Sequence, residues 1–94
     1  MINITYSRDF FRKYDKLVSR NSQLEKKYAK CLTHLVLDPF YPSLKTHKVD
    51  ITTLGVVFSS RVTGDIRILW KYLNRDTIII LTTGGHEGKS SVYK

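Results

Sequence analysis

The apolar residues of this chain change their spacing at Pro39, and this change constrains the fold more than any other feature. From Phe10 to Leu35 they recur every three or four residues, as on one face of a helix. After Pro39, and also over residues 2–6, apolar and polar residues alternate as they do in strands. Strands grouped after a pair of helices predict an α+β fold in the order β-α-α-β-β-β-β.

The two helices have recognisable boundaries. Ser7 is a typical N-cap for the first helix, and Ser22 with Glu25 fits a capping box at the start of the second. Pro39 ends the second helix one or two residues before it. Because almost no linker separates the helices, we predict an antiparallel helical hairpin. Its apolar residues are Phe10, Phe11, Tyr14, Leu17 and Val18, then Leu24, Tyr28, Cys31, Leu32 and Leu35.

The second half of the chain predicts four strands, at residues 44–49, 56–62, 65–73 and 77–83. The first of them is short and polar. The last contains the uninterrupted apolar run TIIIL, which predicts a central strand covered on both faces. Short turns join these strands, so the segment should be mainly antiparallel. No linker or repeat divides the sequence, and we expect residues 1–94 to form one domain.

Alternation along the middle hairpin predicts its register. If the apolar faces of its two strands coincide, Val62 lies opposite Ile66 and Arg61 lies opposite Arg67. This pairing requires a three-residue loop, because a two-residue loop would turn Arg67 into the core. Like charges directly opposite each other are unfavourable, unless an anion sits between them. The register therefore predicts an anion-binding pair of arginines.

The overall charge indicates the kind of partner. The 94 residues have a net charge of +8 and a pI near 9.8. So basic a protein should contact nucleic acid, an anionic membrane or an acidic protein, unless the charge only provides solubility. Cys31 is the only cysteine, which excludes an internal disulfide. We find no signal peptide and no run of about 18 apolar residues, and expect a cytoplasmic protein without a membrane partner.

The segment GGHEGKS, residues 84–90, has some features of a phosphate-binding loop. The motif G-x-x-x-x-G-K-[ST] needs its first glycine where this chain has Thr83. The three histidines, His34, His47 and His86, lack the spacing of a zinc site. We therefore expect neither a nucleotide-binding loop nor a metal or other cofactor.

Cleavage of RNA without a metal needs a base, an acid and cations around the phosphate. Histidine suits the proton transfers, and the arginine fork binds phosphate with two hydrogen bonds. We predict that Arg61, Arg67 and His86 are catalytic and that Tyr93 stacks on a base. The residues predicted to contact RNA are Lys45, His47, Lys48 and Lys89, together with the helix lysines. The alternative for each is a solvated side chain without a function.

Three segments resemble a known family: LKTHKV, FSSRVTGDIRILWKY and TIIILTTGGHEGKSSVY. They are similar to the conserved segments of the RelE/ParE superfamily of small toxins from bacterial type II toxin–antitoxin modules. The resemblance implies the α+β fold of RelE and, for its RelE-like and YafQ-like members, an endoribonuclease. Such toxins cut mRNA on the ribosome through the 2′-OH without a required metal. The resemblance also implies an acidic antitoxin and a toxin–antitoxin hetero-oligomer.

The resemblance suggests roles for single residues. Arg67 matches an arginine that holds the scissile phosphate, His86 a proton-transferring histidine and Tyr93 an aromatic residue that aligns the nucleotide. His47 matches a histidine before the middle sheet. Arg61 stands where YafQ-like toxins have another histidine, so proton transfer would rest on fewer groups in this chain. The spacing from His86 to Tyr93 is also longer than in those toxins.

Two other functions remain open at this point. The ParE branch has the same fold and inhibits DNA gyrase without cleaving RNA. A basic interaction protein without activity is the third possibility. Gyrase inhibition predicts DNA damage with intact mRNA, and an inactive protein predicts unaffected growth.

Overall fold

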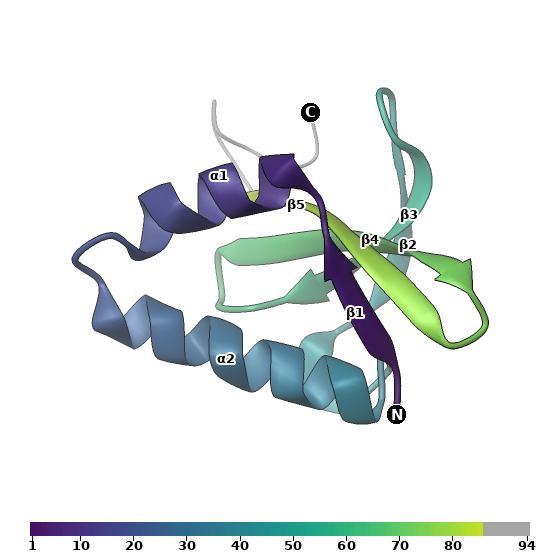
Figure 1. Cartoon of the computed structure of the whole chain (residues 1–94), viewed down its shortest axis with the longest axis horizontal. Coiled ribbons are helices and arrows are strands. Elements are labelled where there is room, and N and C mark those ends of the chain that lie inside the picture. Colours follow the sequence, from purple (N-terminus) through teal and green to yellow (C-terminus); the bar gives the residue numbers. More distant parts are fainter. Residues whose placement is uncertain (86–94) are drawn as a thin grey trace.

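The computed structural model describes residues 1–85 as a twisted five-stranded sheet with two helices packed on one face (Figure 1). Within these residues, neither helix is long and apolar enough to cross a membrane. The predicted α+β class and the predicted order of elements are confirmed. In chain order the elements are β1 (Asn3–Tyr6), α1 (Arg8–Val18), α2 (Ser22–Leu37), the 3-10 turn η1 (Pro42–Leu44), β2 (His47–Ile51), β3 (Gly55–Arg61), β4 (Ile66–Asn74) and β5 (Thr77–Gly85).

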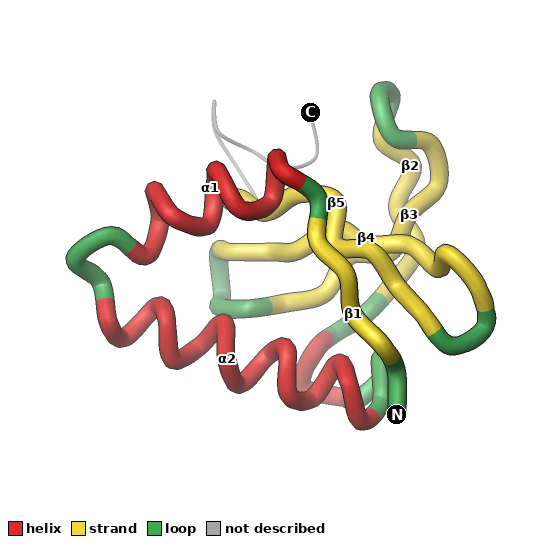
Figure 2. Tube along the Cα trace, viewed as in Figure 1, coloured by secondary structure: helices red, strands yellow, loops and turns green. Residues whose placement is uncertain are grey.

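The strands lie in the order β1-β5-β4-β3-β2, and Figure 2 shows β1 beside β5. From β2 to β5 each strand pairs antiparallel with the next. The N-terminal strand joins parallel to the last one, with Asn3 opposite Thr77. The apolar strand β5 therefore has a neighbour on each side, as its TIIIL run predicted. Its side chains Ile78 and Ile80 are fully buried.

The predicted N-cap is confirmed for α1 and wrong for α2. Ser7 caps α1, because its Oγ accepts a hydrogen bond of 3.1 Å from the Phe10 N–H. The predicted capping box of Ser22 and Glu25 is wrong, since the N-cap of α2 is Asn21. The Asn21 side chain accepts from the Leu24 N–H at 3.1 Å. Asparagine and serine are comparable N-caps, so two adjacent candidates could not be separated by preference alone.

The strand predicted at residues 44–49 begins later in the structure. Its first residue, Leu44, belongs to η1 and is 1% exposed in the main core. The strand itself begins at His47. Pro42 opens η1, where its fixed φ and missing N–H suit a first helical turn. Because Leu44 is buried from within this turn, the extended segment begins later in the sequence than predicted.

The core has two parts, one on each face of the sheet. The larger part lies between the sheet and the helices and includes Phe10, Tyr28, Leu35, Ile68 and Trp70. The smaller part lies on the opposite face and consists of Ile51, Val57 and Leu69, with Val49 and Leu81 against it. Ile68 and Leu69 thus pack on opposite faces, as the predicted alternation of β4 requires.

Two polar groups in the larger core are paired within it. Trp70 is fully buried, and its Nε1–H donates to Ser60 Oγ at 2.8 Å. The Tyr28 hydroxyl bonds to Thr83 Oγ1 at 2.7 Å. Burial raises the pKa of Tyr28 to about 12, so this hydroxyl remains protonated at neutral pH. The first bond joins β4 to β3, and the second joins α2 to β5.

Candidate nucleic-acid interface

The β3–β4 hairpin has the register that the sequence predicted. Arg61 lies opposite Arg67, and Ser59 lies opposite Leu69. The Val62 N–H donates to the Ile66 carbonyl at 2.9 Å and closes the hairpin. Because Leu69 belongs to the smaller core, the arginines project from the sheet face that the helices do not cover. We call Arg61 and Arg67 the arginine pair.

Both members of the arginine pair bond to the loop that joins their strands. Arg61 Nε donates to the Thr63 carbonyl at 3.2 Å, and Arg67 Nη1 donates to the same oxygen at 2.6 Å. Arg67 Nη1 also lies 3.3 Å from the Gly64 carbonyl. A carbonyl between two guanidinium groups reduces their repulsion. A guanidinium has five N–H donors, so these bonds occupy only part of the capacity of the pair.

The backbone of Arg67 is connected to α2 through two hydrogen bonds. Thr83 Oγ1 donates to the Arg67 carbonyl at 2.7 Å and accepts from the Tyr28 hydroxyl. Thr83 is 1% exposed and Tyr28 is equally buried. Breaking a hydrogen bond between buried groups costs free energy, because water cannot replace the lost partner. These two bonds therefore restrict the position of the strand that bears Arg67.

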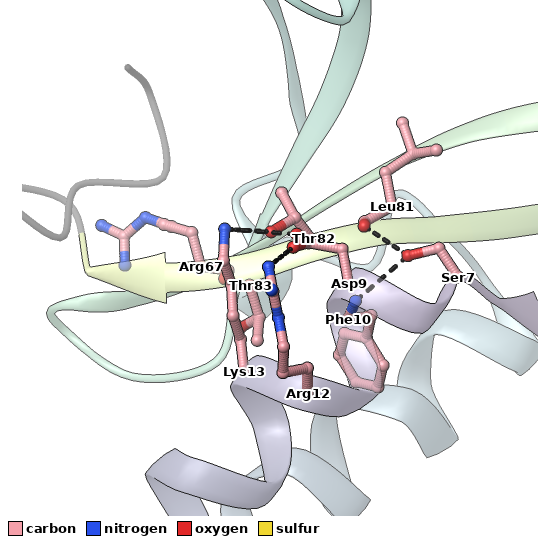
Figure 3. Close-up of polar contacts among 9 residues, drawn as sticks. All are labelled: Ser7, Asp9, Phe10, Arg12, Lys13, Arg67, Leu81, Thr82 and Thr83. Atoms are coloured by element: carbon pink, nitrogen blue, oxygen red, sulfur yellow. Dashed lines mark hydrogen bonds and ion pairs between the residues drawn. The ribbon is translucent and has the colours of Figure 1, made fainter.

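Helix α1 contributes a second polar cluster beside β5, drawn in Figure 3. Lys13 Nζ donates to Thr82 Oγ1 at 3.0 Å and lies 3.2 Å from Asp9 Oδ2. Arg12 also donates to Asp9, at 2.6 Å. Thr82 lies opposite Leu69 in the sheet, so this cluster borders the face that carries the arginine pair. Lys13 lies outside the apolar stripe of α1, and no local signal in the sequence points to Thr82, 69 residues away.

The carboxyl group of Asp9 is strongly influenced by this cluster. Burial alone would raise its pKa, but hydrogen bonds from Thr82, Lys13 and Arg12 outweigh burial and hold the pKa below its ordinary value. Asp9 is therefore an anion at neutral pH and neutralises part of the charge that α1 brings to the sheet.

The residues predicted around β2 lie on different faces. His47 pairs with Ser59, which puts it on the same face as the arginine pair. Its Nδ1 is 2.8 Å from the carbonyl of Lys45, an exposed residue with a left-handed backbone. Lys48 pairs with Phe58, which packs against the larger core, and so Lys48 lies on the helix side. The structure therefore brings His47 and the arginine pair to one face, but not Lys48.

The end of β5 reaches the arginine pair. Gly84 lies opposite Arg67 and Gly85 lies opposite Ile66. The predicted residues His86, Lys89 and Tyr93 lie outside the described residues. In the part of the chain that is described, no group of three or more His, Cys, Asp or Glu residues is arranged to hold a metal ion.

Comparisons with known proteins identify the fold. No family model and no curated protein matches the sequence. Among solved structures, YafQ from E. coli has a TM-score of 0.69 at 22% identity, with 90% of this chain and 93% of that chain covered. The YoeB–YefM complex from Staphylococcus aureus gives 0.68 at 21% identity, over 88% and 94%. The YoeB/ParE toxin from Agrobacterium tumefaciens gives 0.73 at 11% identity, over 92% and 100%. The chain thus has the fold of the RelE/ParE toxins, as its sequence motifs predicted.

Proposed function

We propose that this protein is the toxin of a type II toxin–antitoxin module and cleaves mRNA by metal-independent attack of the ribose 2′-OH. The main support is the arginine pair, in which Arg61 and Arg67 face each other on an open side of the sheet. Two neighbouring guanidinium groups can donate hydrogen bonds to the oxygens of one phosphate. The arginine pair would bind the scissile phosphate and stabilise the negative charge that develops on it during the reaction.

The reaction proceeds in one displacement. A base removes the 2′-OH proton, the 2′ oxygen attacks phosphorus, and the bond to the 5′ oxygen breaks as an acid protonates it. The products are a 2′,3′-cyclic phosphate and a free 5′-OH. The arginine pair stabilises the crowded transition state, His86 exchanges protons, and Tyr93 positions a base. Arg61 stands where YafQ-like toxins have a histidine that could carry a proton. Since arginine remains charged and does not transfer protons, we assign to Arg61 the stabilisation of charge and the alignment of the phosphate.

The geometry around the arginine pair suits this reaction because it is organised before RNA binds. Thr63 orients both guanidinium groups through one carbonyl, and Thr83 holds the Arg67 backbone. Electrostatic catalysis benefits from charges that do not reorganise during the reaction. His47, on the same face, and the exposed Lys45 would extend the contact along the RNA backbone, and we assign the same role to Lys89.

The partner of the toxin is proposed to be an acidic antitoxin protein. The +8 charge favours an acidic segment that folds on the toxin surface. A similar fold occurs in the structure of the YoeB–YefM complex. The protein would therefore occur as a toxin–antitoxin hetero-oligomer until the antitoxin is removed, and would then act on mRNA at the ribosome in the cytoplasm.

Inhibition of DNA gyrase is the second candidate function, and the similarity to a YoeB/ParE toxin is the observation that favours it. It needs no RNA-cleaving site. The two functions differ in what is damaged after the protein is produced in a bacterium. Ribonuclease activity shortens mRNA and leaves plasmid supercoiling intact, whereas gyrase inhibition relaxes plasmids and leaves mRNA intact.

An induction experiment separates these functions. Wild type, Arg67→Ala and His86→Ala are expressed at equal levels, and mRNA length and plasmid topology are followed with time. We expect wild type alone to fragment mRNA. Equal fragmentation by all three would contradict the assigned site, and relaxed plasmids with intact mRNA would favour gyrase inhibition.

A further inference from the structure

A basic pocket lies beside the arginine pair, on the side of the hairpin loop that faces α2. Its volume is about 310 Å³. Its lining includes Lys27, Lys30 and His34 from α2 and Arg61, Thr63 and Gly64 from the hairpin. We call this cavity the α2 pocket. No described residue that lines it is an Asp or Glu, so the charges that Lys27, Lys30 and Arg61 bring to the pocket are not balanced within its lining.

The positive charge of the α2 pocket has a defined arrangement. Lys27 and Lys30 are three residues apart on α2 and therefore share one side of the helix. Cys31 also lines the pocket, and burial raises the pKa of its thiol to about 12. The thiol is consequently neutral at physiological pH and provides no counter-charge. An anion of phosphate size would relieve the repulsion among the cations.

Arg61 connects the α2 pocket to the arginine pair. It faces Arg67 across the hairpin and also lines the pocket. Its guanidinium lies along the loop. Nε donates to the Thr63 carbonyl, and Nη2 is 3.5 Å from the position that a Cβ atom would take if Gly64 had one. The cationic surface is therefore continuous over the loop, from the open face of the sheet to α2.

An aromatic pair stands at the same pocket. His34 lines it and stacks on Tyr41, with ring centroids 4.2 Å apart and planes 12° from parallel. Tyr41 remains 42% exposed in this position. Proteins that bind single-stranded nucleic acid combine cationic grooves with exposed aromatic rings on which bases stack.

We infer that the α2 pocket is a second phosphate subsite, which holds the backbone of single-stranded RNA next to the phosphate at the arginine pair. The strand passes over Thr63 and Gly64, Lys27 and Lys30 bind a neighbouring phosphate, and Tyr41 stacks on a base. The inference rests on the proposed RNA substrate. An acidic peptide is the other possible occupant, but it would make no use of the stacked rings or of the continuity with the arginine pair.

Binding to an uncleavable strand tests the inference independently of catalysis. The probe is a fluorescent oligouridine with 2′-O-methyl ribose, which lacks the attacking hydroxyl, titrated at several salt concentrations. The pocket variant is Lys27→Gln/Lys30→Gln. The matched control is Lys16→Gln/Lys26→Gln, which removes the same charge from exposed helix positions outside the pocket lining.

We expect the pocket variant to bind about tenfold more weakly than the control. Its plot of log affinity against log salt should also be shallower by about 1.4, since each contact to single-stranded phosphate contributes about 0.7. Tyr41→Leu should weaken binding about fivefold without changing this slope, because stacking releases no counterions. Circular dichroism confirms that each variant is folded.

Three results would overturn the subsite. In the first, wild type does not bind the oligouridine. In the second, the pocket variant and its control bind it equally well. In the third, the pocket variant loses affinity only for an oligoglutamate peptide that is tested in parallel. The last result would assign the pocket to an acidic protein. If the pocket variant binds the oligouridine more weakly but wild type cleaves no natural RNA, the subsite stands and the ribonuclease proposal fails.

Discussion

Arg61 and Arg67 face each other across the β3–β4 hairpin and donate hydrogen bonds to the same oxygen, the carbonyl of Thr63. A cross-strand pair of like charges is unfavourable in an ordinary sheet. Here a loop carbonyl lies between the two groups and aligns them. The arrangement keeps two cations close together in the absence of a ligand, as an anion-binding site requires.

Arg67→Lys should reduce the rate of RNA cleavage by about a hundredfold or more. Lysine keeps the charge but cannot provide the planar fork that binds two phosphate oxygens and the Thr63 carbonyl together. The matched control is Arg75→Lys, in the exposed turn between β4 and β5. The measurement is kcat on a defined RNA. A rate near wild type for Arg67→Lys would mean that charge alone suffices.

Thr83→Val should destabilise the protein and also slow cleavage. It leaves the buried Tyr28 hydroxyl without its Thr83 partner and removes one hydrogen bond to the Arg67 carbonyl, which costs about 1–3 kcal/mol of unfolding free energy. Urea unfolding measures this loss, and kcat is compared at a temperature where the variant is fully folded. Thr77→Val, at the half-buried start of the same strand, is the control. Equal stability and equal kcat for both variants would refute the supporting role of Thr83.

Asn21→Ala should lower the free energy of unfolding by about 1 kcal/mol, because α2 loses its N-cap. Ser22→Ala should have almost no effect, although the sequence favoured Ser22 as the cap. Urea unfolding of the two variants decides between these residues. A larger loss for Ser22→Ala would restore the capping box.

Asp9→Asn should narrow the pH range in which the protein is stable. The pKa of Asp9 is lowered in the folded state, so its carboxylate stabilises the fold above the unfolded-state value of 3.8. This contribution is complete at neutral pH and is lost as the pH falls through the lowered folded-state pKa. The difference in stability between wild type and Asp9→Asn should therefore vanish in strong acid, with Asp15→Asn as the exposed control. A difference that is independent of pH would contradict the role of this carboxylate.

The sequence predicted the features that depend on neighbouring residues. The change of apolar spacing at Pro39 indicated which segments are helices and which are strands. The alternation along β3 and β4 predicted that Arg61 faces Arg67, because period-two patterns determine which residues share a face. The one misplaced strand began with Leu44, an apolar residue that the core takes into a 3-10 turn instead.

The contacts that the sequence did not predict join residues that are far apart in the chain. The bond from Lys13 to Thr82 spans 69 positions, and the one from Tyr28 to Thr83 spans 55. The α2 pocket likewise forms only where α2 meets the hairpin loop. Helical or strand periodicity indicates that Lys13, Lys27 and Lys30 face solvent, but it contains no information on which distant element lies beside them.

The chemical nature of the cleaved end tests the central claim most directly. Purified protein is incubated with mRNA, either with ribosomes in Mg²⁺ or without ribosomes in EDTA, because EDTA dissociates ribosomes, and the new 3′ ends are analysed. We predict 2′,3′-cyclic phosphates, and resistance wherever the attacking hydroxyl is replaced by 2′-O-methyl. Arg67→Ala should abolish the product under the same conditions. Intact mRNA with wild type under both conditions, or new 3′ ends that carry a free hydroxyl, would contradict the proposed function.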